Sequence, residues 1–157
     1  MRGKKQAKKR PPYLDTKYNS TLIGELINKV LMDGKKEKAQ KIVYSALEII
    51  EVKSKKPALE VFEMAIRKAS PEIEVKSKRI GGATYQVPVE VSPGRKIDLV
   101  LRWLIGTARS KQGKKMDNYL AEEIISMYSG EGSVIKKRDD VHKMAEANKA
   151  FAHFARF

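Results

Sequence analysis

Residues that could perform catalysis or bind a metal are scarce in this chain. It contains two histidines and no cysteine, so disulfides and thiolate metal sites are excluded. The HExxH and GxSxG motifs are missing, as is any paired zinc-ligand spacing. Two acidic pairs have simpler interpretations: Asp139-Asp140 suits the start of a helix, and Glu122-Glu123 a solvated helix face. We therefore predict no enzymatic activity, no catalytic residue, no metal site and no cofactor.

Lysine and arginine dominate the charged residues instead. The chain has 33 of them against 19 aspartates and glutamates, a formal net charge of +14, and a pI near 9.9. Such an excess opposes folding by self-repulsion unless a polyanion neutralises it. Nucleic acid is the first candidate, because each neutralised phosphate releases condensed counterions. An anionic membrane surface and a merely soluble basic protein are the alternatives. No apolar stretch is long enough to span a bilayer. We expect nucleic acid and no membrane partner.

The basic residues form several separate groups along the chain. One is an N-terminal arm over residues 1–12, which cannot bury apolar area and is expected to be disordered alone. Others fall in predicted loops, and this spread over most loops is typical of a protein embedded in folded RNA. The predicted RNA contacts are Arg2, Lys4, Lys5, Lys8, Lys9, Arg10, Lys35, Lys36, Lys76, Arg95, Lys96, Arg102, Arg109, Lys111, Lys114, Lys115, Lys136, Lys137 and Arg138.

One basic group follows a predicted helix rather than a loop. Arg95, Arg102 and Arg109 are seven residues apart, so they project from nearly one helix face. We interpret this stripe as lacking the interleaved carboxylates of an ordinary ion-paired face. Arginine also offers planar, bidentate donors that suit phosphate. We therefore predict phosphate contact along the stripe, with Lys96 at its border and Trp103 buried against the core.

Six helices are needed to position these groups. Apolar residues recur at three-and-four spacing over residues 22–31, 39–50, 57–70, 93–108 and 116–129. A sixth helix, placed after Arg138, contains Val141, Met144 and Ala145. We interpret these apolar stripes as core. A length of 157 residues fits one domain, so we predict a mainly α single domain over residues 1–157.

Between the third and fourth helices the pattern changes to strict alternation. Two alternating runs meet at Gly81-Gly82, which predicts a protruding two-stranded β-hairpin over residues 72–91. Its outer half carries Lys76, Lys78 and Arg79 around the glycine tip. An isolated hairpin is marginal in water, so a cationic hairpin with no sheet to join indicates insertion against RNA.

Three segments carry a more specific pattern. They are DGKK at 33–36 leading to IVYSAL at 42–47, VKSKRIGGATYQVPVEV at 75–91, and VHKMAEANKAFAH at 141–153. In this order and spacing they resemble the family of small-ribosomal-subunit protein seven, of the bacterial type, across nearly the whole chain.

The resemblance implies a six-helix body with an extended hairpin, and a structural role in the small subunit of the cytoplasmic ribosome. It further implies early, direct binding to the 3′ major domain of 16S rRNA, which nucleates assembly of the 30S head. The protein would lie at the subunit interface near the decoding centre and the tRNA exit site. Small-subunit proteins nine and eleven would be neighbours. The hairpin residues implied to approach mRNA and exit-site tRNA are Lys78, Arg79, Gly81, Gly82, Tyr85 and Gln86.

Two other classes of function remain as alternatives. Helical bundles with basic faces include free helix-turn-helix regulators, which a stronger footprint on duplex DNA than on rRNA would reveal. An RNA-acting enzyme could bind through the same basic groups, and turnover lost on mutation of a single carboxylate would reveal it.

Overall fold

The predicted mainly α fold with one hairpin is confirmed. The computed structural model describes residues 14–156, with side chains to Phe154, so the six basic residues predicted in the N-terminal arm lie outside the described residues. The elements are α1 Thr21–Val30, α2 Lys36–Ser54, α3 Ala58–Ala69, β1 Ile73–Ile80, β2 Ala83–Glu90, α4 Pro93–Ser110, α5 Met116–Ser129, α6 Ser133–Ala147 and a 3-10 helix, η1, Lys149–Arg156.

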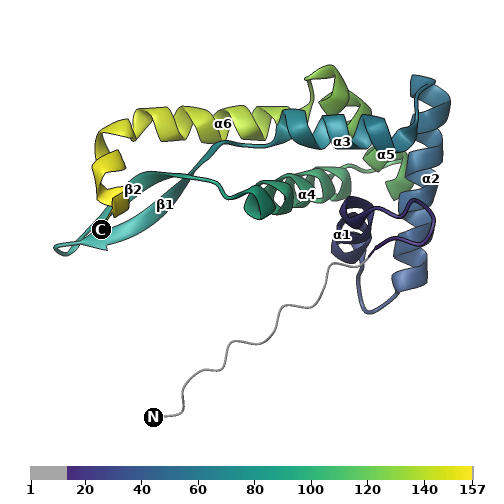
Figure 1. Ribbon diagram of the computed structural model, residues 1–157, viewed down its shortest axis with the longest axis horizontal. Coiled ribbons are helices and arrows are strands. Elements are labelled where there is room, and N and C mark those ends of the chain that lie inside the picture. Colours follow the sequence, from purple (N-terminus) through teal and green to yellow (C-terminus); the bar gives the residue numbers. More distant parts are fainter. Residues whose placement is uncertain (1–13, 157) are drawn as a thin grey trace, which may run out of the picture.

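Helices α1 to α5 form a body at one end of the molecule (Figure 1). At its centre α5 packs against α2, α3 and α4, while α1 packs against α2 and α4. Fully buried side chains from three helices meet there, among them Phe62, Leu101, Leu104, Leu120 and Ile124. The apolar stripes predicted for these five helices lie in this core or pack against it. Apolar burial of this kind is the main stabilising term of the body.

The hairpin extends away from the body, and α6 runs beside it (Figure 1). Strands β1 and β2 pair antiparallel from Ile73–Glu90 at the base to Ile80–Ala83 at the tip. The two-residue turn requires positive φ at both positions, and Gly81 and Gly82 have φ of 57° and 91°. The predicted glycine tip is therefore confirmed.

Helix α6 begins earlier than predicted. It starts at Ser133, so Lys136, Lys137 and Arg138 belong to the helix, not to a loop before it, and Asp139-Asp140 does not stand at the helix start. Gly130, in the left-handed conformation, closes α5, and Gly132 at φ 95° precedes α6. Val134 and Ile135 are then buried by the body, and this burial sets the first turn of α6. The basic triplet carries no signal that separates a helix from a loop.

Two further predictions about the C-terminal part need correction. Met144, predicted to face the core, is 53% exposed, whereas Ala145 of the same helix is buried. The 3-10 helix η1 after α6 was not predicted. It folds back onto β2, so the outer half of the hairpin is packed against another element.

Candidate nucleic-acid interface

The arginine stripe on α4 is exposed, as predicted, but it does not lack carboxylates. Asp98 lies on the same helix and accepts from Arg95 Nη1 at 3.2 Å and from Arg102 Nη2 at 3.0 Å. Lys29 of α1 donates to the other oxygen of Asp98. The interpretation of a stripe without interleaved carboxylates was wrong, because Asp98 is three residues after Arg95 and four before Arg102, the spacings at which helix side chains meet.

Asp98 therefore gathers three cations at one place on the surface. The hydrogen bond from Lys29 lowers the pKa of Asp98 below its ordinary value, helped by the charges of Lys29, Arg102 and Arg95, although partial burial opposes the shift. The side chain of Arg102 remains 62% exposed, so donors that do not face Asp98 stay available to a phosphate. Asp98 thus reduces the net positive charge of the stripe, and its ion pairs hold Arg95 and Arg102 in defined positions.

Arg109, the third member of the stripe, caps another helix. Its Nη2 donates to the carbonyl of Val30 at 3.3 Å, and Val30 is the last residue of α1. A cation at the carbonyl end of a helix is favourable because of the helix dipole. Beside the stripe Lys96 is half-buried, and Trp103 packs against the core, as predicted. Gly106 faces open space on the same helix.

The basic loop between α4 and α5 divides into internal and outward-facing cations. Lys111 pairs with Glu123, a carboxylate that is 3% exposed, so the interpretation of Glu123 as a solvated residue was wrong. The other oxygen of Glu123 has no hydrogen-bond partner within the described residues. Lys114 pairs with Glu122 at 2.6 Å. Lys115 is exposed and has no partner in the part of the chain that the structure describes.

The basic triplet of α6 is divided in a similar way. Arg138 donates to Asp139 and to the carbonyl of Lys68, at the end of α3, so it connects two helices. Lys137 Nζ donates to the hydroxyl of Thr107 at 3.3 Å. Lys136 is exposed. Of the three, Lys136 is the residue best placed to meet an external phosphate.

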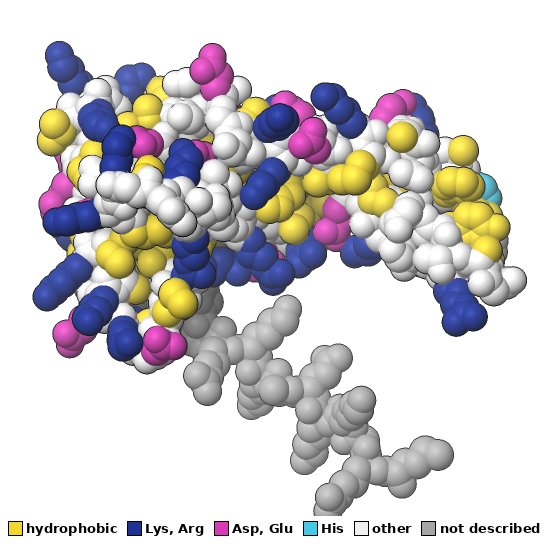
Figure 2. All heavy atoms as spheres, turned by 180° about the vertical axis from the view of Figure 1, so that it is seen from behind, with side chains coloured by type: hydrophobic (Ala, Val, Ile, Leu, Met, Phe, Trp, Pro, Cys, Tyr) yellow, Lys and Arg dark blue, Asp and Glu magenta, His cyan; other side chains and the backbone are white. Residues whose placement is uncertain are grey.

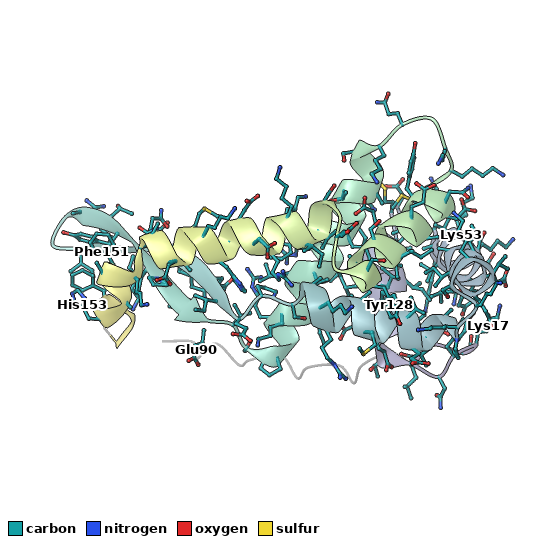
Figure 3. All side chains as sticks on the ribbon, turned by 90° about the horizontal axis from the view of Figure 1, so that it is seen from above. Lys17, Lys53, Glu90, Tyr128, Phe151 and His153 are labelled. Atoms are coloured by element: carbon teal, nitrogen blue, oxygen red, sulfur yellow. The ribbon has the colours of Figure 1, made fainter. Side chains whose placement is uncertain are left out.

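The hairpin cations differ in their surroundings. Lys76 pairs with Glu74 at 3.1 Å, and Lys78 donates to the carbonyl of Phe154 at 3.1 Å. Arg79, next to the glycine tip, is exposed and has no partner among residues 14–154. Gln86 accepts a hydrogen bond from Ser77 at 3.2 Å, and Tyr85 packs against Phe151 and Phe154. Figure 3 shows Phe151 and His153 beside the hairpin, at the end of α6.

Near the start of α2, Lys35 pairs with Asp33 at 3.4 Å, and Lys36 is the first residue of the helix. The predicted cations are thus spread over the body and the hairpin rather than brought to one point. Figure 2 shows lysine and arginine side chains scattered over the helical body, with few at the opposite end of the molecule.

Several exposed cations whose side chains make no hydrogen bond or ion pair with the described residues were missed. Except for Lys55, which follows the last residue of α2, they lie on helix faces opposite the apolar stripes, where the spacing of apolar residues would have indicated exposure. They are Lys38, Lys41, Lys53, Lys55, Arg67 and Lys143.

Neither a metal site nor a membrane span is found in the described residues. They contain no group of three or more histidine or acidic side chains that could hold a metal ion. Similarly, none of their helices is both long and apolar enough to cross a bilayer.

A helical body with outward cations on α2, α3, α4 and α6 and a protruding hairpin defines a class of protein: a basic scaffold suited to folded RNA. The sequence model of one family, described as ribosomal protein S7p/S5e, matches residues 2–149. The chain belongs to this family.

Curated relatives agree over most of the chain. A protein named small ribosomal subunit protein uS7 from Chloroflexus aggregans is 55% identical over 148 residues, covering 94% of this chain and 94% of the relative. Proteins of the same name are 54% identical over 140 residues in Fervidobacterium nodosum, covering 89% of this chain and 90% of the relative. In Thermotoga petrophila the identity is 53% over 144 residues, covering 92% of each.

Membership in this family makes the chain a structural constituent of the small ribosomal subunit and not an enzyme. It binds ribosomal RNA there and serves translation.

Proposed function

We propose that the chain binds the 3′ major domain of 16S rRNA directly and early, and so nucleates assembly of the 30S head. In the finished subunit it lies at the subunit interface near the decoding centre and the tRNA exit site, beside small-subunit proteins nine and eleven. This proposal rests on the family and on the three sequence segments that resemble its bacterial members.

The observation that carries the RNA contacts is the division of the cations into two sets. Internal cations such as Lys111 and Arg138 hold the fold together. Outward cations such as Lys115 and Lys136 are exposed and lack partners in the described residues. We assign the outward set, together with Arg95, Arg102 and Lys96 on α4, to rRNA phosphates. Rigid helices hold these cations apart, so that RNA segments that would otherwise repel one another can approach.

The hairpin is the element proposed to approach mRNA and exit-site tRNA. It reaches beyond the helical body (Figure 1), and its tip combines the exposed Arg79 with Gly81 and Gly82, which leave the backbone uncovered. A nucleotide can therefore come close to the peptide groups of the turn. Arg79 supplies the charge, whereas Lys78 is partly engaged by the C-terminal residues.

Ultraviolet crosslinking in purified small subunits, with mapping to RNA and peptide, tests the proposal. We expect peptides of α4 to crosslink to the 3′ major domain of 16S rRNA, and the peptide over residues 76–90 to crosslink to mRNA or exit-site tRNA. The matched variant Arg79→Ala should reduce the hairpin crosslinks and leave those of α4 unchanged. Crosslinks of α4 to another rRNA domain would contradict the assembly role. A hairpin that crosslinks to neither mRNA nor tRNA would contradict the second part.

A further inference from the structure

Besides the packing of β1 against α6, separate contacts hold the base and the outer half of the hairpin. At its base the backbone amide of Glu72 donates to Nε2 of His142 on α6 at 3.1 Å, and the amide of Val91 donates to the carbonyl of Glu72 at 3.0 Å. The bond to His142 requires an unprotonated Nε2. The second attachment lies near the tip and is made by η1.

The outer attachment is aromatic. The Tyr85 ring packs against Phe151 and Phe154, with ring centroids 5.3 Å and 5.1 Å apart. Lys78 Nζ donates to the backbone carbonyl of Phe154 at 3.1 Å. Lys78 and Tyr85 are cross-strand partners, and the next pair toward the tip is Arg79–Thr84. The C-terminal residues therefore hold both strands directly behind the turn.

Between the two attachments the hairpin packs on α6, with Val87 of β2 and Ala145 of α6 buried, but two surface hollows interrupt this interface. One hollow of about 460 Å³ is lined by Ile73 and Pro88 of the strands and by His142 and Ala145 of α6. A second, of about 520 Å³, is lined by Val75, Gln86 and Met144, among others. A two-stranded hairpin is marginal by itself. Because hollows interrupt its interface with α6, packing along this stretch fixes the angle of the hairpin less tightly than an uninterrupted interface would.

We propose that η1 is the outer clamp of the hairpin, and that Phe151 and Phe154 are positioning residues that fix the direction in which the tip points. Both act through Tyr85 and place Arg79, Gly81 and Gly82 without meeting the RNA themselves. Only one part of this proposal rests on the proposed function, namely that the tip meets RNA. The mechanical role, holding the outer strands, is a property of the free protein.

Hydrogen exchange of the free, full-length protein tests the clamp. We expect the double variant Phe151→Ala/Phe154→Ala to raise exchange of the amides between Ser77 and Tyr85 by about tenfold or more, since two aromatic pairs are lost. The backbone carbonyl of residue 154, which accepts the hydrogen bond from Lys78, is retained in this variant. A change in exchange therefore measures the loss of the two aromatic rings. Amides of α2 and α5 should exchange as in the wild type, because the body is not touched.

Two single variants serve as controls. Phe154→Tyr keeps the ring and should keep the protection of the outer strands, and Met144→Ala removes an exposed side chain of α6 outside the clamp and should change nothing. Unchanged exchange of the outer strands in the double variant would overturn the proposal. Equal loss of protection throughout the body would also overturn it, because the residues would then support the whole fold.

A functional measurement separates the clamp from the proposed function. In purified subunits the double variant should shift or weaken the hairpin crosslinks while leaving those of α4 unchanged. Looser strands together with unaltered hairpin crosslinks would overturn the positioning role. If the wild-type hairpin crosslinks to neither mRNA nor tRNA, the proposed function fails by itself, and the exchange result still decides whether η1 holds the strands.

Discussion

Asp98 stands among three cations from two helices, and its environment makes a prediction about stability and pH. Its side chain is 26% exposed and that of Lys29 is 27% exposed, so the pair is partly shielded from water. We expect Asp98→Asn to lower the free energy of unfolding at pH 7 by about 1–2 kcal/mol, since the charge-assisted hydrogen bonds are lost.

The pH dependence follows from the direction of the pKa shift. The hydrogen bond from Lys29 lowers the pKa of Asp98 below 3.8 in the folded protein. The stabilisation is therefore complete above that ordinary value and is lost as the pH falls through the lowered folded pKa. Urea denaturation of both proteins at several pH values should show a constant difference in stability near neutrality that narrows only below pH 3.8.

Asp33→Asn is the matched control, because Asp33 pairs with Lys35 at a side-chain exposure of 74%. Exposed pairs contribute little, so this variant should be close to the wild type. A difference for Asp98→Asn that stays constant down to full acid unfolding would contradict the assigned role of the carboxylate.

At the scale of the element, the hairpin turn depends on backbone conformation rather than on space. A Cβ on Gly81 or Gly82 would meet nothing within 4 Å, but both residues have positive φ. Asparagine tolerates the left-handed region, whereas a β-branched residue does not.

We therefore expect Gly82→Val to destabilise the hairpin by about 1–2 kcal/mol, and Gly81→Asn to be nearly neutral. Hydrogen exchange of β1 and β2 should be faster in the valine variant alone, with the melting temperature of the helical body almost unchanged. Equal effects of the two substitutions would show that the turn does not require a left-handed conformation.

At the scale of the whole molecule, the net charge of +14 makes rRNA binding dependent on salt. If about eight phosphates are neutralised, log affinity should fall with log salt at a slope of roughly −6 to −7. A filter-binding titration against 16S rRNA measures this slope, and a value near zero would contradict an electrostatic mechanism.

Two neighbouring lysines test the division of the cations into internal and outward sets. Lys115→Ala should reduce the steepness of the salt slope by about one without changing stability. Lys111→Ala should instead cost about 2–3 kcal/mol of stability, because it leaves the buried Glu123 carboxylate without its cation. The same outcome for both variants would remove the distinction.

The sequence by itself determined the six α-helices and the hairpin, the core of the first five helices and the basic character of the chain. The spacing of apolar residues reflects the repeat of the helix or strand itself, so it can be read from the sequence. Likewise, a Gly-Gly pair between two alternating runs specifies a tight turn. The segments at 33–47, 75–91 and 141–153 were sufficient to identify the family, which the comparisons confirmed.

Only the tertiary structure decided which cations face outward. Lys111 and Lys115 lie in the same basic loop, and nothing in the sequence distinguishes their roles. Lys111 pairs with the buried carboxylate of Glu123 on α5, whereas Lys115 is exposed. The partners of a long charged side chain depend on how helices pack. For the same reason η1 was missed, since Phe151 and Phe154 pack against Tyr85, which is far away in the chain. Such contacts exist only after the hairpin and α6 have come together.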